Sequence, residues 1–180
     1  MKVIKILDKK FQLVIQNSVI TKTIERLAKE MNKDLEGKNP LFISILNGSF
    51  IFAADLYKRI SLLDSEITFV RQASYDNDTS TGKVKELIGL NETIEGRTVV
   101  VLEDIVDSGI TLDYLCRILH MMNPAEVLTA TLLLKPDALK IEVCPDYVGL
   151  EVPNDFIVGY GLDYNGYGRN LSDIYSVINE

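Results

Sequence analysis

The stretch from Thr98 to Thr111, with the sequence TVVVLEDIVDSGIT, constrains the possible fold more than any other part of this chain. It begins with a β-branched apolar run over residues 99–102, which is typical of a strand buried on both faces. An acidic pair and a small-residue turn follow, and apolar residues then recur at helical spacing, at Leu112, Leu115, Leu119 and Met122. The stretch therefore predicts a strand, a turn and a helix, the repeating unit of an α/β fold.

The turn in this stretch has the composition of a phosphate site. Residues 107–111 stand at the start of the expected helix, where free backbone N–H groups attract an anion. Glu103 and Asp104 come just before the turn, and carboxylates there suit a hard cation or sugar hydroxyls. Asp, Ser and Gly are also ordinary turn and cap residues of any α/β protein. The combination nevertheless favours a magnesium-bound, phosphorylated sugar, because carboxylates this close together repel one another unless a positive group neutralises them.

The rest of the chain continues the alternation of strands and helices. We expect a helix over residues 18–35 and strands over 11–15, 41–46, 67–70, 127–134, 147–152, 156–160 and 174–178. This order predicts a parallel sheet with helices on both faces. Ligands of such sheets bind outside the carboxyl ends of the strands, which is where the turns after Leu46, Leu102 and Leu134 lie.

The segment LEDIVDSGIT resembles the phosphoribosyl pyrophosphate (PRPP) signature of type I phosphoribosyltransferases. More narrowly, it is similar to the version in the hypoxanthine(-guanine) phosphoribosyltransferase family, which has the same Glu-Asp pair and an Asp that opens the phosphate loop. The similarity runs through nearly the whole chain. It implies a Rossmann-like parallel sheet flanked by helices, with a small base-binding hood. It also implies a single domain over residues 1–180, with the hood built from the N- and C-terminal segments.

The resemblance implies a role for each residue of the signature. Glu103 and Asp104 would hold the ribose and a magnesium ion, and the loop would seat the 5-phosphate through its amides and hydroxyls. Asp107 falls where the family has a carboxylate near N7 of the purine, as general acid and base. The PRPP-binding residues implied are Glu103, Asp104, Asp107, Ser108, Gly109, Ile110, Thr111, Asn47, Gly48 and Arg169.

A second small-residue turn, Asn47-Gly48-Ser49, follows the apolar run LFISIL. Its composition alone fits a plain turn at least as well as a phosphate site that uses backbone N–H groups. The resemblance assigns it to a short loop that contacts pyrophosphate. The family often carries Lys where this chain has Asn47, so the resemblance implies a backbone contact here without the side-chain charge.

Residues 74–83 form a polar, small-residue stretch, and its composition alone favours a solvated hairpin loop. The segment SYDNDTSTGKVK, however, resembles the flexible catalytic loop of the family, with its Ser-Tyr start and Ser-Thr-Gly middle. The resemblance therefore implies that Ser74 and Tyr75 begin a lid that excludes water from the reacting groups.

Lys135 follows a long apolar run, and a lysine that extends to solvent at a loop start would explain it as well as a site would. In the family a lysine at this place donates to the exocyclic oxygen of the purine. The same resemblance implies that Phe156 stacks on the base and that the backbone of Ile157 reads its edge. It also implies that Asp163, in the purine-binding segment LDYN, meets a second magnesium ion. Arg169 falls where the family has an arginine that contacts pyrophosphate.

Composition excludes several other classes of protein. The formal net charge of −7 argues against a nucleic-acid binder, which needs a basic face. No apolar run is long enough for a membrane span, and Lys5 and Asp8 interrupt the apolar region that a signal peptide would need. We therefore expect a cytoplasmic protein without a membrane partner. Cys116 and Cys144 are expected to be reduced core residues. The single histidine, His120, argues against a catalytic triad or a His-rich zinc site.

Taken with these patterns, the resemblance implies an enzyme of purine salvage. It would transfer 5-phosphoribosyl from PRPP to N9 of hypoxanthine, and of guanine, giving IMP or GMP and pyrophosphate with Mg²⁺ as cofactor. A xanthine/guanine-preferring transferase is the nearest alternative. A non-catalytic regulator that senses PRPP or nucleotides is a second, and the acidic charge counts against it. The resemblance also implies a homodimer or homotetramer.

Overall fold

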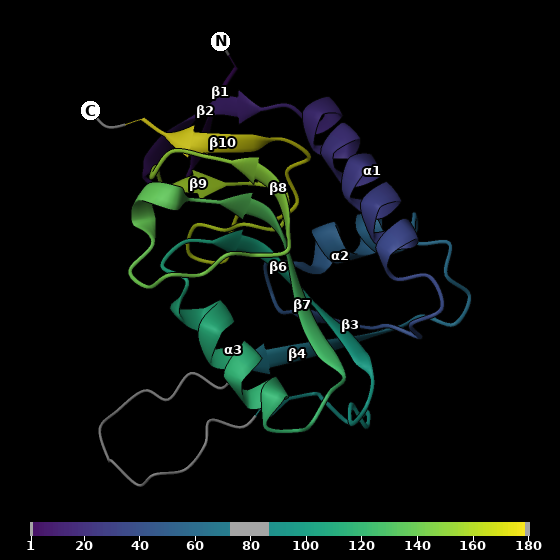
Figure 1. Cartoon of the computed structure of the whole chain (residues 1–180). Coiled ribbons are helices and arrows are strands. Elements are labelled where there is room, and N and C mark those ends of the chain that lie inside the picture. Colours follow the sequence, from purple (N-terminus) through teal and green to yellow (C-terminus); the bar gives the residue numbers. More distant parts are fainter. Residues whose placement is uncertain (1, 73–86, 179–180) are drawn as a thin grey trace, which may run out of the picture.

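The computed structural model describes residues 2–72 and 87–178, which form two β-sheets and three α-helices (Figure 1). The larger sheet has the strand order β5-β4-β3-β6-β7-β8 and the smaller one β1-β2-β10-β9. The larger sheet contains β3 (Leu41–Ile45), β4 (Glu66–Gln72), β5 (Leu87–Ile88), β6 (Thr98–Val106), β7 (Glu126–Leu134) and β8 (Tyr147–Glu151). The smaller sheet contains β1 (Val3–Ile6), β2 (Lys9–Ile15), β9 (Ile157–Val158) and β10 (Ile174–Val177). The helices are α1 (Asn17–Asp34), α2 (Phe50–Tyr57) and α3 (Ile110–His120), with a 3₁₀ turn η1 (Pro136–Ala138).

The larger sheet confirms the expected α/β fold. Strands β4, β3, β6, β7 and β8 pair in parallel, and the short β5 adds an antiparallel edge beside β4. Helices α1 and α2 cover one face and α3 covers the other (Figure 1). A parallel sheet covered on both faces needs apolar side chains on both, and this explains the unbroken apolar runs of its strands.

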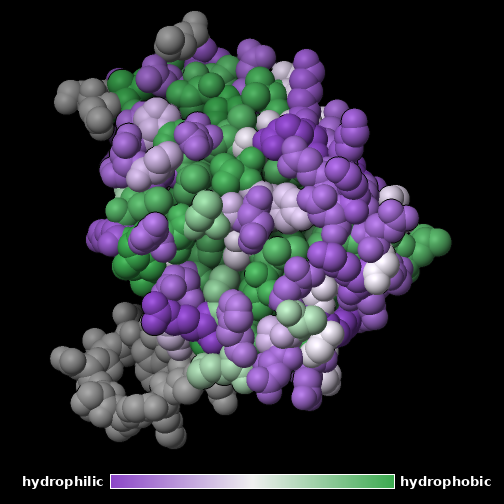
Figure 2. Space-filling model, viewed as in Figure 1, coloured by the Kyte–Doolittle hydropathy of each residue, from purple (hydrophilic) through white to green (hydrophobic). Residues whose placement is uncertain are grey.

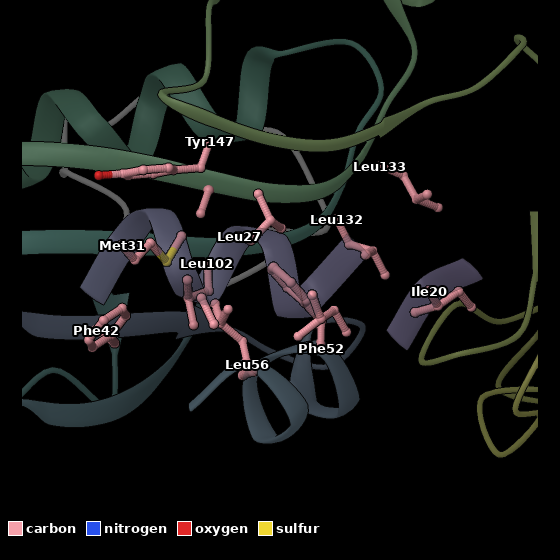
Figure 3. Close-up of a cluster of buried hydrophobic side chains, with 14 of the residues drawn as sticks. Ile20, Leu27, Met31, Phe42, Phe52, Leu56, Leu102, Leu132, Leu133 and Tyr147 are labelled. Atoms are coloured by element: carbon pink, nitrogen blue, oxygen red, sulfur yellow. The ribbon is translucent and has the colours of Figure 1, made fainter. Parts of the chain in front are cut away.

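Alternation along β6 shows how the two faces divide. Val99 and Val101 pack with the buried residues of α3, whereas Val100 and Leu102 pack with those of α1 and α2. Figure 3 shows the second cluster, in which side chains of α1, α2 and the sheet interdigitate. Its labelled members are Ile20, Leu27, Met31, Phe42, Phe52, Leu56, Leu102, Leu132, Leu133 and Tyr147.

Several boundaries differ from the sequence-based expectation. Strand β6 extends to Val106, so Glu103 and Asp104 lie within the strand rather than after it. The cause is the partner strand, because β7 continues the parallel ladder as far as the pair Val106 and Leu134. Helix α3 ends at His120, which leaves Met122 in the following turn. Strand β9 covers only two residues of the expected five, since residues 159–161 all have positive φ and an extended strand cannot continue through them.

The smaller sheet joins the two ends of the chain (Figure 1). Strand β10 pairs antiparallel with β2 and with β9, so the N-terminal hairpin and the C-terminal segment form one unit. Its core consists of Phe11, Val158 and Tyr175. Asp173 fixes this unit to α1, because its carboxylate accepts from the backbone N–H of Asn17 at 2.9 Å.

Two further expectations concern cysteines and membranes. Both cysteines are free thiols, but Cys144 is exposed, so the expectation of a core residue is wrong there. Cys116 is half-buried on α3, and burial raises the pKa of its thiol to about 11.

Within residues 2–72 and 87–178 we find no helix with the length and apolar character of a membrane span. Figure 2 shows hydrophilic residues over the outward side of α1 and hydrophobic ones beside it.

Candidate active site

A cleft of about 410 Å³ lies at the carboxyl ends of β3, β6 and β7, and strand β9 with the segment that follows it closes one side. It brings together most of the residues that the sequence singles out. These are Asn47, Gly48, Glu103, Asp104, Asp107, Thr111, Lys135, Phe156, Ile157, Asp163 and Arg169. Ser108 and Gly109 instead line a smaller adjoining pocket of about 80 Å³, together with Glu103, Asp107 and Thr111. Ile110 lines neither pocket and is half-exposed, and Ser74 and Tyr75 lie outside the described residues.

The turn between β6 and α3 needs a glycine at its last position. Gly109 has a φ of 80°, and an added Cβ would lie 2.7 Å from a methyl carbon of Val143. Gly109 at the N-cap has no side chain, and the N–H of Ile110, the first helical residue, donates to Ser108 Oγ at 3.4 Å. The N-terminal turn of α3 borders the smaller pocket. This is the geometry that binds a phosphate group at a helix N-terminus.

Glu103 and Asp104 form a buried acidic pair at the end of β6. Burial raises the pKa of Glu103 well above its usual range, and the neighbouring Asp104 carboxylate raises it further. Burial also raises the pKa of Asp104, although bonds to Glu103 and to the Ile105 amide act in the opposite direction. One carboxylate oxygen of Glu103 is buried without a hydrogen-bond partner in the part of the chain that the structure describes. A pair of this kind fits a hard cation that takes one or two protein carboxylates and completes its shell with ligand oxygens.

Lys135 and Asp107 form an ion pair that the sequence analysis missed. The Lys135 Nζ lies 2.8 Å from Asp107 Oδ2, and only 7 % of the lysine side chain is exposed. Each residue directly follows its strand, and the strands end at the paired residues Val106 and Leu134. Adjacent strand ends therefore place the ammonium beside the carboxylate, which is how a buried lysine is tolerated.

A second ion pair joins Arg169 to Asp163. The guanidinium lies 2.6 Å from Asp163 Oδ1 and also donates to the carbonyl of Gly161 at 2.7 Å. The other carboxylate oxygen of Asp163 accepts from the Gly166 N–H at 2.6 Å. Both cations that line the cleft within the described ranges are thus already paired with carboxylates that line it too.

The apolar side of the cleft comes from the smaller sheet. The ring of Phe156 is 45 % exposed and lies near those of Phe11 and Tyr164, with centroids 6.4 Å and 5.8 Å away. Its neighbour Ile157 is buried and lines the same cleft. Lys9 Nζ also lies 5.7 Å from the centroid of the Phe156 ring. A half-exposed aromatic ring at a cleft suits stacking on a flat heterocycle.

Some residues at the cleft were not singled out by the sequence. Leu162 and Ile105 line it, and Arg71 approaches its rim with a nitrogen 2.6 Å from Asn47 Oδ1. A signal for Arg71 exists, because it follows directly on the apolar run over 67–70 and so stands near a strand end.

The class of protein is defined by a match to the phosphoribosyl transferase domain over residues 14–165. The chain is 42 % identical over 170 residues to the hypoxanthine-guanine phosphoribosyltransferase of Lactococcus lactis, covering 93 % of this chain and 91 % of the relative. A crystal structure of a hypoxanthine-guanine phosphoribosyltransferase from Bacillus anthracis matches with a TM-score of 0.82 at 36 % identity, covering 93 % of this chain and 97 % of that one. The chain belongs to the hypoxanthine-guanine phosphoribosyltransferase family, as its signature indicates.

One relative is a much longer protein. The bifunctional protein TilS/HprT of Listeria monocytogenes is 42 % identical over 161 residues, which cover 89 % of this chain and 25 % of the relative. The chain therefore spans about a quarter of the length of that protein.

Proposed function

We propose that this protein is a purine-salvage enzyme that transfers the 5-phosphoribosyl group of PRPP to N9 of hypoxanthine, and also of guanine. The products are IMP or GMP and pyrophosphate. The observation that carries this proposal is the meeting, in one cleft, of an acidic strand end, a helix N-terminus and a buried lysine. The names of the relatives from Lactococcus lactis and Bacillus anthracis support the same activity.

Magnesium fits the acidic pair, because Glu103 carries a buried oxygen without a partner among the described residues. Glu103 and Asp104 would hold one ion on the ribose side, and Asp163 a second. Asp163 already accepts from Arg169 at Oδ1 and from Gly166 at Oδ2, so a metal ion there would share one of these oxygens with a protein donor. When bound, the ions neutralise the leaving pyrophosphate and organise the ribose hydroxyls.

Asp107 and Lys135 act on the base. A lysine ammonium has three donors, so Lys135 keeps its bond to Asp107 and still donates to O6 of a 6-oxopurine. The amino group of adenine offers no acceptor there and would leave a buried charge unpaired, which favours rejection of adenine. Asp107 holds and moves the proton at N7 as the bond to N9 forms.

The remaining residues position the substrates. The loop over 107–111 seats the 5-phosphate at the N-terminus of α3, and Gly48 with Arg169 meets the pyrophosphate. Phe156 stacks on the purine and the backbone of Ile157 reads its edge. We also propose that the enzyme works as a homodimer or homotetramer, which sedimentation analysis would test.

Pyrophosphate release tests the function directly. The protein is given PRPP and Mg²⁺ with hypoxanthine, guanine, xanthine or adenine in turn. Release with hypoxanthine, with or without guanine, and none with adenine supports both the activity and the role of Lys135. Release only with xanthine and guanine keeps the mechanism and changes the substrate. Binding of PRPP without release from any base contradicts the enzyme and favours a regulator.

A further inference from the structure

The cleft is acidic, although its proposed ligand is a polyanion. Its described lining includes the carboxylates of Glu103, Asp104, Asp107 and Asp163 and the cations of Lys135 and Arg169. Each of these cations is already bonded to one of the carboxylates, at 2.8 Å and 2.6 Å. Metal ions held by Glu103 and Asp104 and by Asp163 would neutralise part of this charge, whereas the loop after β3 has no charge of its own.

The loop after β3 packs closely against the site. A Cβ on Gly48 would lie 1.7 Å from Asp104 Oδ2, so the loop backbone packs directly on the acidic pair. A Cβ on Gly161 would lie 2.0 Å from the Gly48 carbonyl oxygen, so the loop is also covered from the other side. Asn47 belongs to this closely packed loop and lines the cleft, so a side chain that bonds to Asn47 is held at the rim of the cleft.

Arg71 brings a positive charge to this loop. Strand β4 runs parallel to β3 with Ile45 opposite Val70, so the next residue, Arg71, emerges at the same edge of the sheet. Its Nη2 donates to Asn47 Oδ1 at 2.6 Å, and the residue is exposed. An amide oxygen orients a guanidinium without cancelling its charge, whereas a carboxylate in the same place would cancel it.

We propose that Arg71 is a pyrophosphate-binding residue, held at the loop by Asn47. A guanidinium has five N–H donors in a planar fork and suits phosphate oxygens better than any other side chain. Arg71 thus supplies, at the rim of the cleft beside Asn47, the cation that the neutral loop lacks. This inference rests on the proposed function for the identity of the ligand and adds a residue to that site.

A double-mutant cycle separates charge from anchoring. Arg71→Ala, Asn47→Ala and the double variant are compared for pyrophosphate binding by calorimetry in the presence of Mg²⁺, and for KM and kcat with PRPP. We expect Arg71→Ala to weaken pyrophosphate binding about 10- to 100-fold, the range of a charge-assisted hydrogen bond, and to raise KM more than it lowers kcat. Asn47→Ala removes the anchor of Arg71 but keeps its charge, so it should cost several-fold less.

Two further variants complete the test. Arg71→Ala combined with Asn47→Lys places an ammonium at the same rim, and we expect it to recover most of the lost affinity. Arg117→Ala removes an exposed arginine on α3 that pairs with Asp113, and it should leave pyrophosphate binding unchanged. Unchanged affinity in Arg71→Ala, or equal and non-additive losses in both alanine variants, would overturn the inference. Pyrophosphate release by the wild-type protein is measured alongside, so a failure of the proposed function is recognised separately.

Discussion

Two strand-to-helix turns line the cleft and differ in the side chains that they contribute to it. The turn after β6 contributes the acidic side chain of Asp107, and Gly109 begins α3 in a left-handed conformation. The turn after β3 has no charged residue, and its serine points inward: buried Ser49 bonds to the Ile45 carbonyl and, at 2.7 Å, to Ser44. Its place in the site depends on neighbours.

In the proposed function, turns of similar composition contribute to the site in different ways. The turn after β6 is proposed to act through its own side chains, so substitutions within it should change the chemistry. The turn after β3 is proposed to act through its backbone and through residues that pack on it, so substitutions there should change binding and stability. The following predictions test this division.

The largest effect is expected at Asp107. Asp107→Asn keeps a partner for Lys135 but removes the group that holds the proton, so turnover should fall about 10²- to 10⁴-fold with little change in the KM for PRPP. Steady-state kinetics with hypoxanthine measures both values. Asp113→Asn, at a half-buried carboxylate of α3 that pairs with Arg117, is the matched control and should retain activity. Equal losses in turnover and in PRPP affinity would contradict the assigned role.

Replacing Lys135 should change the choice of base. Lys135→Gln removes the ammonium but offers both a donor and an acceptor, so the preference for hypoxanthine over adenine should fall about 10- to 100-fold, as for loss of a charged hydrogen bond. The ratio of kcat/KM for the two bases measures this. Unchanged selectivity would refute the account of Lys135, and loss of folding is checked by thermal denaturation.

In the turn after β3, the backbone itself is the sensitive feature. Gly48→Ala places a Cβ against the Asp104 carboxylate, so we expect a loss of about 1–3 kcal/mol in stability and a higher KM for PRPP. Gly37→Ala, which has a positive φ but open space, should cost about 1–2 kcal/mol without any change in KM. Denaturant unfolding and kinetics on both variants test the difference. A normal KM in Gly48→Ala would break the comparison.

The smallest effect concerns Glu103, whose raised pKa has a predictable sign. The folded protein disfavours the charged form, so its cost to stability is absent well below pH 4.5, the ordinary value for this group, and grows as pH rises toward the raised value. Without Mg²⁺, the Glu103→Gln variant should therefore have a higher melting temperature than the wild type at pH 8, by roughly 2–4 °C for each kcal/mol gained in the free energy of unfolding. At acidic pH its melting temperature should be no higher than that of the wild type. PRPP with Mg²⁺ should stabilise the wild type more than the variant. A lower melting temperature at pH 8 would contradict the assigned burial cost.

Much of the architecture follows from local sequence. The apolar run before Glu103 predicts a buried strand, and the spacing from Leu112 to Leu119 predicts the helix after it, because both patterns depend only on the period of the local backbone. Since the carboxyl ends of parallel strands share one edge, the sequence also indicates that the turns after β3, β6 and β7 meet.

Contacts between segments far apart in the sequence were decided only by the tertiary structure. The bonds from Lys135 to Asp107 and from Arg71 to Asn47 depend on which strands are neighbours and on their register. Local propensity carries no information about either. For the same reason, the sequence located Glu103 beside the turn but not within β6, because the pairing of β7 extends that strand. Sequence thus determined which groups reach the edge of the sheet, and the sheet determined which of them pair.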